Sequence, residues 1–149
     1  MSARLDYAVR ALLELAGEAP DRLTRDELAA RQQIPAKYLE SILASLRHAG
    51  LVRSHRGKDG GYTLGAEATE ITVGAVARVV EGPLTLVQGA RPETVAYEGG
   101  AAALQSLWVA VRAALRSVLD SVTLADLLAG QLPTDVASLL DAADAWSPR

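Results

Sequence analysis

The sequence predicts a mainly α-helical protein that carries one small β-hairpin. Three observations support this fold class. Apolar residues recur at three- and four-residue spacing through most of the chain, which is the pattern of a buried helix face. A glycine-rich turn separates two short runs of strand-forming residues near residue 57, as in a hairpin. A long apolar segment follows a stretch without periodicity, which indicates a compact N-terminal domain and a separate C-terminal helix.

Three helices are expected before the hairpin. The first covers about residues 3–16 and ends near Gly17 and Pro20. The second covers about 25–32 and begins with a capping box, in which Thr24 and Glu27 satisfy each other's backbone amides. The third covers about 36–48, and Gly50 is well suited to end it. Two helices of this size joined by a tight turn form a helix-turn-helix, whose second helix can enter the DNA major groove.

The hairpin follows directly, with strands expected at residues 51–55 and 62–64. The turn between them combines glycines with cations, so its tip is positively charged. Thr72 is placed to cap a fourth helix over about 73–81, and Gly82–Pro83 closes the module. Residues 1–83 are therefore expected to form a winged helix-turn-helix domain, with the hairpin as the wing.

The remainder is expected to serve assembly. Residues 84–100 are interpreted as a loop, and a long helix is expected from residue 101 to 122. Its apolar stripe extends beyond the first domain, and a second copy of the chain is the simplest cover. A helix start at Thr123 and an amphipathic helix over 134–146 complete the C-terminal part, 101–149. The predicted dimerisation residues are Leu104, Leu107, Trp108, Val111, Leu115, Val118, Leu119 and Val122.

Charge is segregated along the chain, although the net charge is only −3. The stretch from Lys37 to Lys58 holds five cations and one anion, a local net charge of +4. The chain after Pro83 holds four cations and seven anions, a net charge of −3. A local basic patch explains how an acidic chain can bind a nucleic acid.

Ten residues are candidates for DNA contact. Five lie on the outer face of the third helix, four lie on or near the wing, and Thr24 begins a helix whose N-terminus can touch a phosphate. Lysine can bond guanine, glutamate can accept from a cytosine amino group, and serine bonds several groups. A cationic hairpin tip suits the minor groove or its phosphates. The candidates are Thr24, Lys37, Tyr38, Glu40, Ser41, Ser45, Arg53, His55, Arg56 and Lys58.

Structural roles compete with these assignments. Tyr38 fits packing beneath the hairpin as well as it fits a phosphate contact. Glu40 fits a solvated surface acid, Thr24 fits a helix cap alone, and the cations fit an ordinary solvated face. A helix–turn–helix–hairpin also occurs in protein–protein interaction modules, so that function remains the alternative.

Several function classes have no support in the composition. The chain has no cysteine, which excludes disulfides, cysteine-based zinc sites and thiolate-held iron–sulfur clusters. Its two histidines lie on different elements, and no glycine-rich phosphate loop joins a strand to a helix, so no enzyme or metal site is expected. No uninterrupted apolar run of about 18 residues predicts a membrane span, and no export signal is recognised, which favours the cytoplasm.

Nine stretches of the sequence together carry a family resemblance: Tyr7–Leu12, Ile34–Glu40, Leu46–Val52, Ser54–Gly57, Gly60–Leu64, Ile71–Val73, Val80–Leu84, Leu107–Trp108 and Leu119–Leu127. Through them the sequence resembles the Rrf2 family of bacterial regulators over about residues 3–128, most specifically over the first 84. The resemblance implies a dimeric winged-helix regulator, expected to be a repressor, whose long helix crosses its twin and whose dimer binds a two-fold operator. It also implies that Glu40, Lys37 and Ser41 contact bases and that Arg56 enters the minor groove.

One departure from the family pattern concerns the sensor. Many members hold an iron–sulfur cluster with three cysteines in the loop before the dimer helix. Here Gln88 and Ala102 stand near the positions of the first and last cysteine, and Gln105 near that of an assisting histidine. The resemblance therefore implies a member without a cluster. The loop is then open to a small-molecule effector or a partner protein, and a sensor with non-cysteine ligands is a further alternative.

Overall fold

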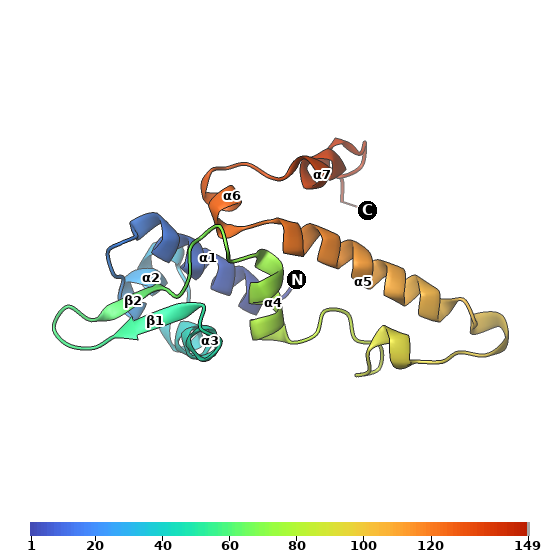
Figure 1. The fold of residues 1–149 in the computed structure, drawn as a ribbon, viewed down its shortest axis with the longest axis horizontal. Coiled ribbons are helices and arrows are strands. Elements are labelled where there is room, and N and C mark those ends of the chain that lie inside the picture. Colours follow the sequence, from blue (N-terminus) through green and yellow to red (C-terminus); the bar gives the residue numbers. More distant parts are fainter. Residues whose placement is uncertain (149) are drawn as a thin grey trace.

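The computed structural model describes residues 1–148 of the chain. Figure 1 shows the first four helices and the hairpin gathered at one end, from which α5 extends as a long arm. The predicted fold class is confirmed. The elements are α1 (Ala3–Glu18), α2 (Arg25–Gln32), α3 (Ala36–His48), β1 (Val52–His55), β2 (Gly61–Leu64), α4 (Val73–Glu81), α5 (Leu104–Ser121), α6 (Leu124–Leu128) and α7 (Thr134–Ala137), with 3-10 turns at Pro92–Thr94, Gly99–Ala101 and Ser138–Asp141.

A continuous apolar core joins the first four helices. Each helix contributes the residues that its three- and four-residue spacing places on one face. Removing such a side chain from water contributes about 1.5–3 kcal/mol, so the spacing decides which face turns inward. The largest fully enclosed side chains of α1 to α3 are Leu12, Leu15, Leu28, Leu39, Ile42, Leu43 and Leu46.

The wing is fixed to the residues that precede α2. Strands β1 and β2 pair antiparallel, with Val52 opposite Leu64 and His55 opposite Gly61. Leu23 pairs with the hairpin from the other side of β2. The Tyr62 amide donates to the Leu23 carbonyl at 2.7 Å, and the Leu23 amide donates to the Tyr62 carbonyl at 3.2 Å. Because Leu23 directly precedes the cap of α2, the wing and the helix-turn-helix are held in one relative orientation.

The wing also makes a close backbone approach at Gly65. A Cβ atom at this position would lie 1.9 Å from the carbonyl oxygen of Gly50. We predict that Gly65→Ala lowers the free energy of unfolding by about 1–3 kcal/mol, because the backbone must shift to admit the methyl group. Gly100→Ala is the matched control, since an added Cβ there has no neighbour within 4 Å. Thermal unfolding followed by circular dichroism compares them, and equal melting temperatures would contradict the close approach.

After α5 the chain returns to the N-terminal domain. The Val73 amide donates to the Val122 carbonyl, and the Leu124 amide donates to the Ile71 carbonyl, both at 2.9 Å. The helix start predicted at Thr123 is confirmed as a capping box with Asp126. Leu124 is fully buried in the common core, so α6 packs with the N-terminal domain although it follows the long helix.

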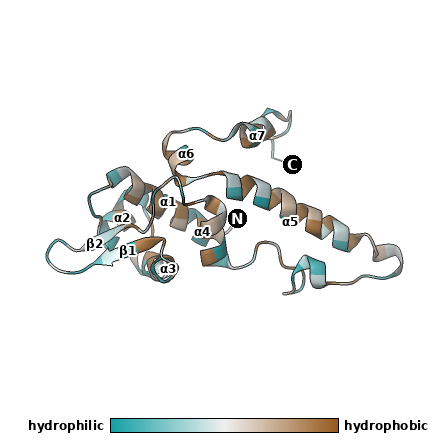
Figure 2. Cartoon of the chain, in the orientation of Figure 1, coloured by the Kyte–Doolittle hydropathy of each residue, from teal (hydrophilic) through white to brown (hydrophobic). Residues whose placement is uncertain are grey.

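Most of α5 is left uncovered by its own chain. Figure 2 shows hydrophobic residues along this helix. Leu107 is 51% exposed, Val111 37% and Leu115 38%, while Leu104, Trp108 and Val118 are half-buried. These residues remain available for the predicted contact between two copies.

Two predicted dimerisation residues do not belong to that surface. Leu119 and Val122 are 8% and 5% exposed, because the last turn of α5 packs on α4. Asp120 pairs with Arg78 of α4 at 2.7 Å in the same place. The sequence pattern could not separate the two ends of the stripe, since a helix face that meets its own domain has the same spacing as one that meets a partner.

The prediction of one helix over residues 134–146 is wrong. Helix α7 ends at Ala137, a 3-10 turn follows to Asp141, and no helix is described after it up to residue 148. Val136 is buried, but Leu139 and Leu140 are 56% and 42% exposed. Short helices depend on packing of their apolar face, and the chain offers no surface to these two leucines.

One segment of the described chain, Gly99–Ser121, is long and apolar enough to cross a membrane by length and composition alone. The sequence was expected to lack such a segment, because Gln105, Arg112 and Arg116 interrupt the apolar run. A match of this kind is weak evidence by itself. An exposed apolar helix is also what a dimer interface requires.

Candidate DNA interface

Helix α3 turns a polar face to solvent. Lys37, Ser41, Ala44 and His48 follow one another at three- and four-residue spacing and are all exposed, opposite the leucines that enter the core. Lys37 makes no hydrogen bond or ion pair with the described residues. This lysine therefore keeps all its donors for a ligand.

Arg4 of α1 reaches across to this face, a contact that the sequence analysis missed. Its guanidinium donates to the hydroxyls of Ser41 and Ser45, both at 3.0 Å, and to the Val80 carbonyl at 3.2 Å. The two serines are thus held by a cation at the edge of α3. Arg4 adds positive charge beside the helix, and a contact 37 residues apart in the chain leaves no local sequence signal.

Glu40 is exposed and lies near a cation of α2. The Arg25 guanidinium is 3.4 Å from the Glu40 carboxylate and 2.9 Å from Asp26. The hydrogen bond that Arg25 donates to Asp26 and the charge of that carboxylate raise the pKa of Arg25. The contact to Glu40 is the longer of the two and both partners are solvated, so it is a weak pair. Glu40 can exchange Arg25 for another donor at little cost.

Tyr38 packs on a tyrosine of α1 and keeps part of its surface exposed. Its ring meets the Tyr7 ring edge to face, with 5.8 Å between the ring centroids, and the side chain remains 38% exposed. An aromatic edge contact fixes the ring, and its exposed part lies on the surface of α3.

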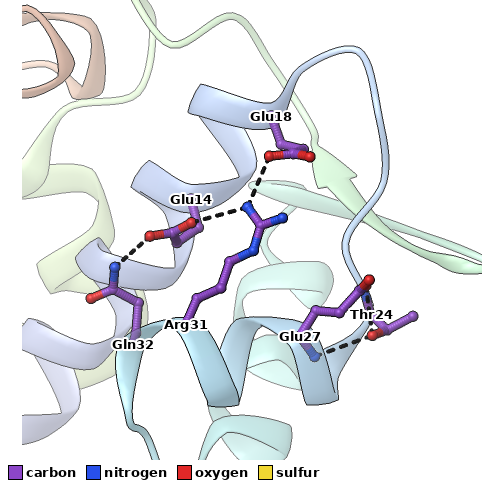
Figure 3. A network of polar contacts seen from close by, with 6 residues as sticks. All are labelled: Glu14, Glu18, Thr24, Glu27, Arg31 and Gln32. Atoms are coloured by element: carbon purple, nitrogen blue, oxygen red, sulfur yellow. Dashed lines mark hydrogen bonds and ion pairs between the residues drawn. The ribbon is translucent and has the colours of Figure 1, made fainter.

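Thr24 acts as a helix cap within a larger polar network. Its hydroxyl accepts from the Glu27 amide at 3.2 Å and donates to the Glu27 carboxylate at 2.8 Å. The backbone hydrogen bond from Thr24 lowers the pKa of Glu27. Figure 3 shows this box beside Arg31, which bonds Glu14 and Glu18 of α1. The hydroxyl is occupied by the cap, and the network holds α2 on α1.

The wing carries three exposed cations, Arg53, Arg56 and Lys58. None of them has a hydrogen bond or ion pair with residues 1–148. His55 is half-buried, and its Nε2 lies 2.9 Å from the Thr63 hydroxyl across the hairpin. The turn is steadied by Arg22, which donates to the Asp59 carbonyl at 3.0 Å. The tip is thus ordered and positively charged.

The cations of α3 and the wing lack the ion pairs that most arginines elsewhere in the described chain make. Six arginines elsewhere pair with carboxylates: Arg10, Arg25, Arg31, Arg78, Arg112 and Arg116. In contrast, all five cations between Lys37 and Lys58 are exposed and without a described partner: Lys37, Arg47, Arg53, Arg56 and Lys58. Uncompensated cations on a helix and a neighbouring hairpin form the electrostatic surface that a polyanion requires. We call these five residues the basic surface.

Residues 1–148 hold no candidate metal site, because no three His, Cys, Asp or Glu side chains come together in this part of the chain. The two histidines also lie on different elements, since His48 ends α3 and His55 bonds Thr63 across the hairpin. The side chains gathered at α3 and the wing are suited to binding rather than to proton transfer.

Comparison with known sequences supports this view of the surface. A family model described as "Rrf2: Iron-dependent Transcriptional regulator" matches residues 1–130. The chain is 46% identical over 142 residues to Rv1287 of Mycobacterium tuberculosis, named as an HTH-type transcriptional regulator, with 95% of this chain and 88% of the relative covered. It is 39% identical over 130 residues to the HTH-type transcriptional regulator CymR of Bacillus subtilis, with 85% and 88% covered.

Solved structures agree with the sequence matches. The structure of CymR, described as the global cysteine regulator of B. subtilis, has a TM-score of 0.74 at 36% identity and covers 88% of this chain and 97% of its own. The structure of T. potens IscR has a TM-score of 0.71 at 33% identity and covers 100% and 92%. These similarities confirm the winged-helix architecture.

Proposed function

Because the chain belongs to the Rrf2 family of DNA-binding transcriptional regulators and is not an enzyme, we propose that it represses transcription as a homodimer on a two-fold DNA site. The observation that carries this proposal is the basic surface, in which five exposed cations of α3 and the wing lack a partner within residues 1–148. Phosphate contacts supply most of the affinity of such proteins for DNA. We also propose that this takes place in the cytoplasm.

Within the complex, α3 enters the major groove and the wing lies along the adjacent minor groove. Lys37 and Ser41 face the base edges, and Glu40 exchanges its weak contact with Arg25 for a cytosine amino group. Arg56 and Lys58 at the wing tip meet the minor groove and its phosphates. The hydrogen bonds between the hairpin and Leu23 support this, because they hold both elements at one spacing.

The dimer is formed through α5. Leu107, Val111 and Leu115 offer an exposed apolar stripe on a helix that projects from the DNA-binding domain. Packing this stripe against its own copy buries it in both chains and creates a two-fold axis. The two basic surfaces then face one duplex in the symmetric arrangement that a two-fold operator requires.

The protein works without an iron–sulfur cluster. Such clusters are held by cysteine thiolates, and the chain has no cysteine, so its residues do not fit the group that the family description implies. We predict a colourless purified protein whose DNA affinity is unchanged by an iron chelator or by exposure to air. Anisotropy titrations before and after treatment measure this. An absorbance band near the visible region that disappears together with DNA binding would contradict it.

Genome-wide mapping of DNA bound in cells tests the regulatory function. The expected result is a set of promoters that share one two-fold symmetric motif, and increased transcripts from those promoters when the gene is deleted. Decreased transcripts would make the protein an activator. Bound DNA without a shared symmetric motif would overturn the proposal of an operator-specific dimer.

A further inference from the structure

A pocket of about 350 Å³ lies where the DNA-binding domain meets the long helix. Its walls come from the end of α4, from the segment that follows it and from α5. Figure 1 shows this segment running outward from α4 alongside α5, which then returns toward the domain. Six charged side chains line the pocket: Arg78, Arg91, Glu93, Arg112, Arg116 and Asp120.

Positive charge is in excess there. Four arginines face two carboxylates, which leaves a net charge of +2 in the lining. Asp120 is shared between Arg78 at 2.7 Å and Arg116 at 4.0 Å, and Glu93 is taken by Arg112. The Arg91 side chain has no hydrogen bond or ion pair with the described residues, and among the arginines and lysines of residues 1–148 this is true elsewhere only of the basic surface. Local ion pairing therefore neutralises the pocket only in part.

Contacts within the protein hold the cations of this pocket in place. The side chain of Arg112 is only 18% exposed, so it is held between α5 and the segment rather than free in solvent. Glu93 has its pKa lowered by a hydrogen bond from its own backbone amide and then by Arg112, with a smaller effect from Arg91. The charge of Arg91 thus acts on the same carboxylate, and both arginines line the same pocket.

We propose that this pocket binds a small organic anion, held by the guanidinium groups of Arg91 and Arg116. Guanidinium groups match the paired oxygens of carboxylates and phosphates in two parallel hydrogen bonds. Pro83 and Leu84 complete the lining with apolar surface. The volume is at the low end for ligand sites, so the ligand is a metabolite with one or two anionic groups and not a nucleotide cofactor.

The pocket differs from the loop positions where relatives carry cysteines. Gln88, Ala102 and Gln105 do not line it, and Gln105 instead donates to the Glu93 carbonyl at 3.2 Å. The arginines come from α4, the segment and α5, three parts that are separate in sequence. A ligand held by Arg91 and Arg116 joins the segment to the dimer helix, beside the end of α4. This inference does not depend on DNA binding.

Calorimetric titration of the purified chain tests the site with two probes, sodium malonate for carboxylates and inorganic phosphate for phosphoryl groups. Sodium chloride at equal ionic strength is the blank. Saturable binding of either probe is expected, and the tighter one identifies the anionic group. Arg91→Gln is expected to weaken it about tenfold or more, since a charge-assisted contact is lost. Arg91 is exposed, so this change leaves folding intact, as an unchanged melting temperature verifies.

Arg22→Gln is the matched control for anion binding, because it removes an exposed cation that lies outside both the pocket and the basic surface. Its affinity for the probe is expected to equal that of the unchanged chain. Absence of saturable binding for both probes would overturn the proposal, as would equal losses in Arg91→Gln and Arg22→Gln. Either result would leave operator binding by the basic surface unaffected, so the two proposals fail separately.

Discussion

Replacing Val111 and Leu115 of α5 by glutamate is expected to convert the protein from a dimer into monomers. Both side chains are more than a third exposed in the single chain, so the substitution leaves the core of each chain intact. The two-fold interface then holds four glutamates, two from each chain, and desolvating them without a partner costs several kcal/mol. The dimer dissociation constant is therefore expected to rise by at least about 100-fold.

Sedimentation velocity over a range of concentrations measures this effect. Leu139→Glu is the matched control, because Leu139 is also an exposed leucine but lies outside α5. It is expected to remain dimeric. If the α5 variant and the control sediment alike as dimers, α5 is not the interface. Because two half-sites are bound together only by a dimer, the α5 variant is also expected to lose most of its operator affinity.

Removing two cations of the basic surface, with Lys37→Gln and Arg56→Gln combined, is expected to weaken operator binding by on the order of 100-fold at physiological salt. A dimer loses four cations in this variant. If each neutralises one phosphate, the slope of log affinity against log salt falls in magnitude by about three to four. Neither side chain has a described partner, so stability is expected to be unchanged.

Fluorescence anisotropy at several salt concentrations gives both quantities. The charge-preserving pair Lys37→Arg and Arg56→Lys serves as the control, and it is expected to keep the salt slope while losing some sequence preference. That separation of charge from geometry follows from the different donor arrangements of the two side chains. A salt slope that is the same in the neutral variant and the unchanged chain would mean that these cations do not meet phosphates.

Local signals predicted the DNA-binding domain well. The capping box at Thr24, the apolar spacing of α3 and the left-handed Gly50 each act within a few residues of where they stand. The helix-turn-helix and hairpin could therefore be placed to within about two residues. Where boundaries moved, as at the start of α5 in Leu104 instead of residue 101, a 3-10 turn that ends at Ala101 and a turn at Ala102 and Ala103 precede the helix.

Contacts between distant segments were beyond the reach of sequence patterns. Arg4 bonds Ser41 and Ser45, and Arg25 lies beside Glu40, but the spacing of these residues in the sequence predicts neither contact. The arginines of the anion pocket come together only when α4, the following segment and α5 have packed. The prediction of a helix over 134–146 failed for a different reason. The helical periodicity is present in the sequence, but no surface of the chain covers Leu139 and Leu140.

The direct test of a two-fold complex is the mass and affinity of the protein on defined DNA. Native mass spectrometry with a duplex that carries both half-sites is expected to give two chains per duplex. Scrambling one half-site is expected to weaken binding strongly, because one basic surface then meets DNA without base contacts. One chain per duplex, with equal affinity for the intact and the half-scrambled site, would contradict operator binding by a dimer of this chain.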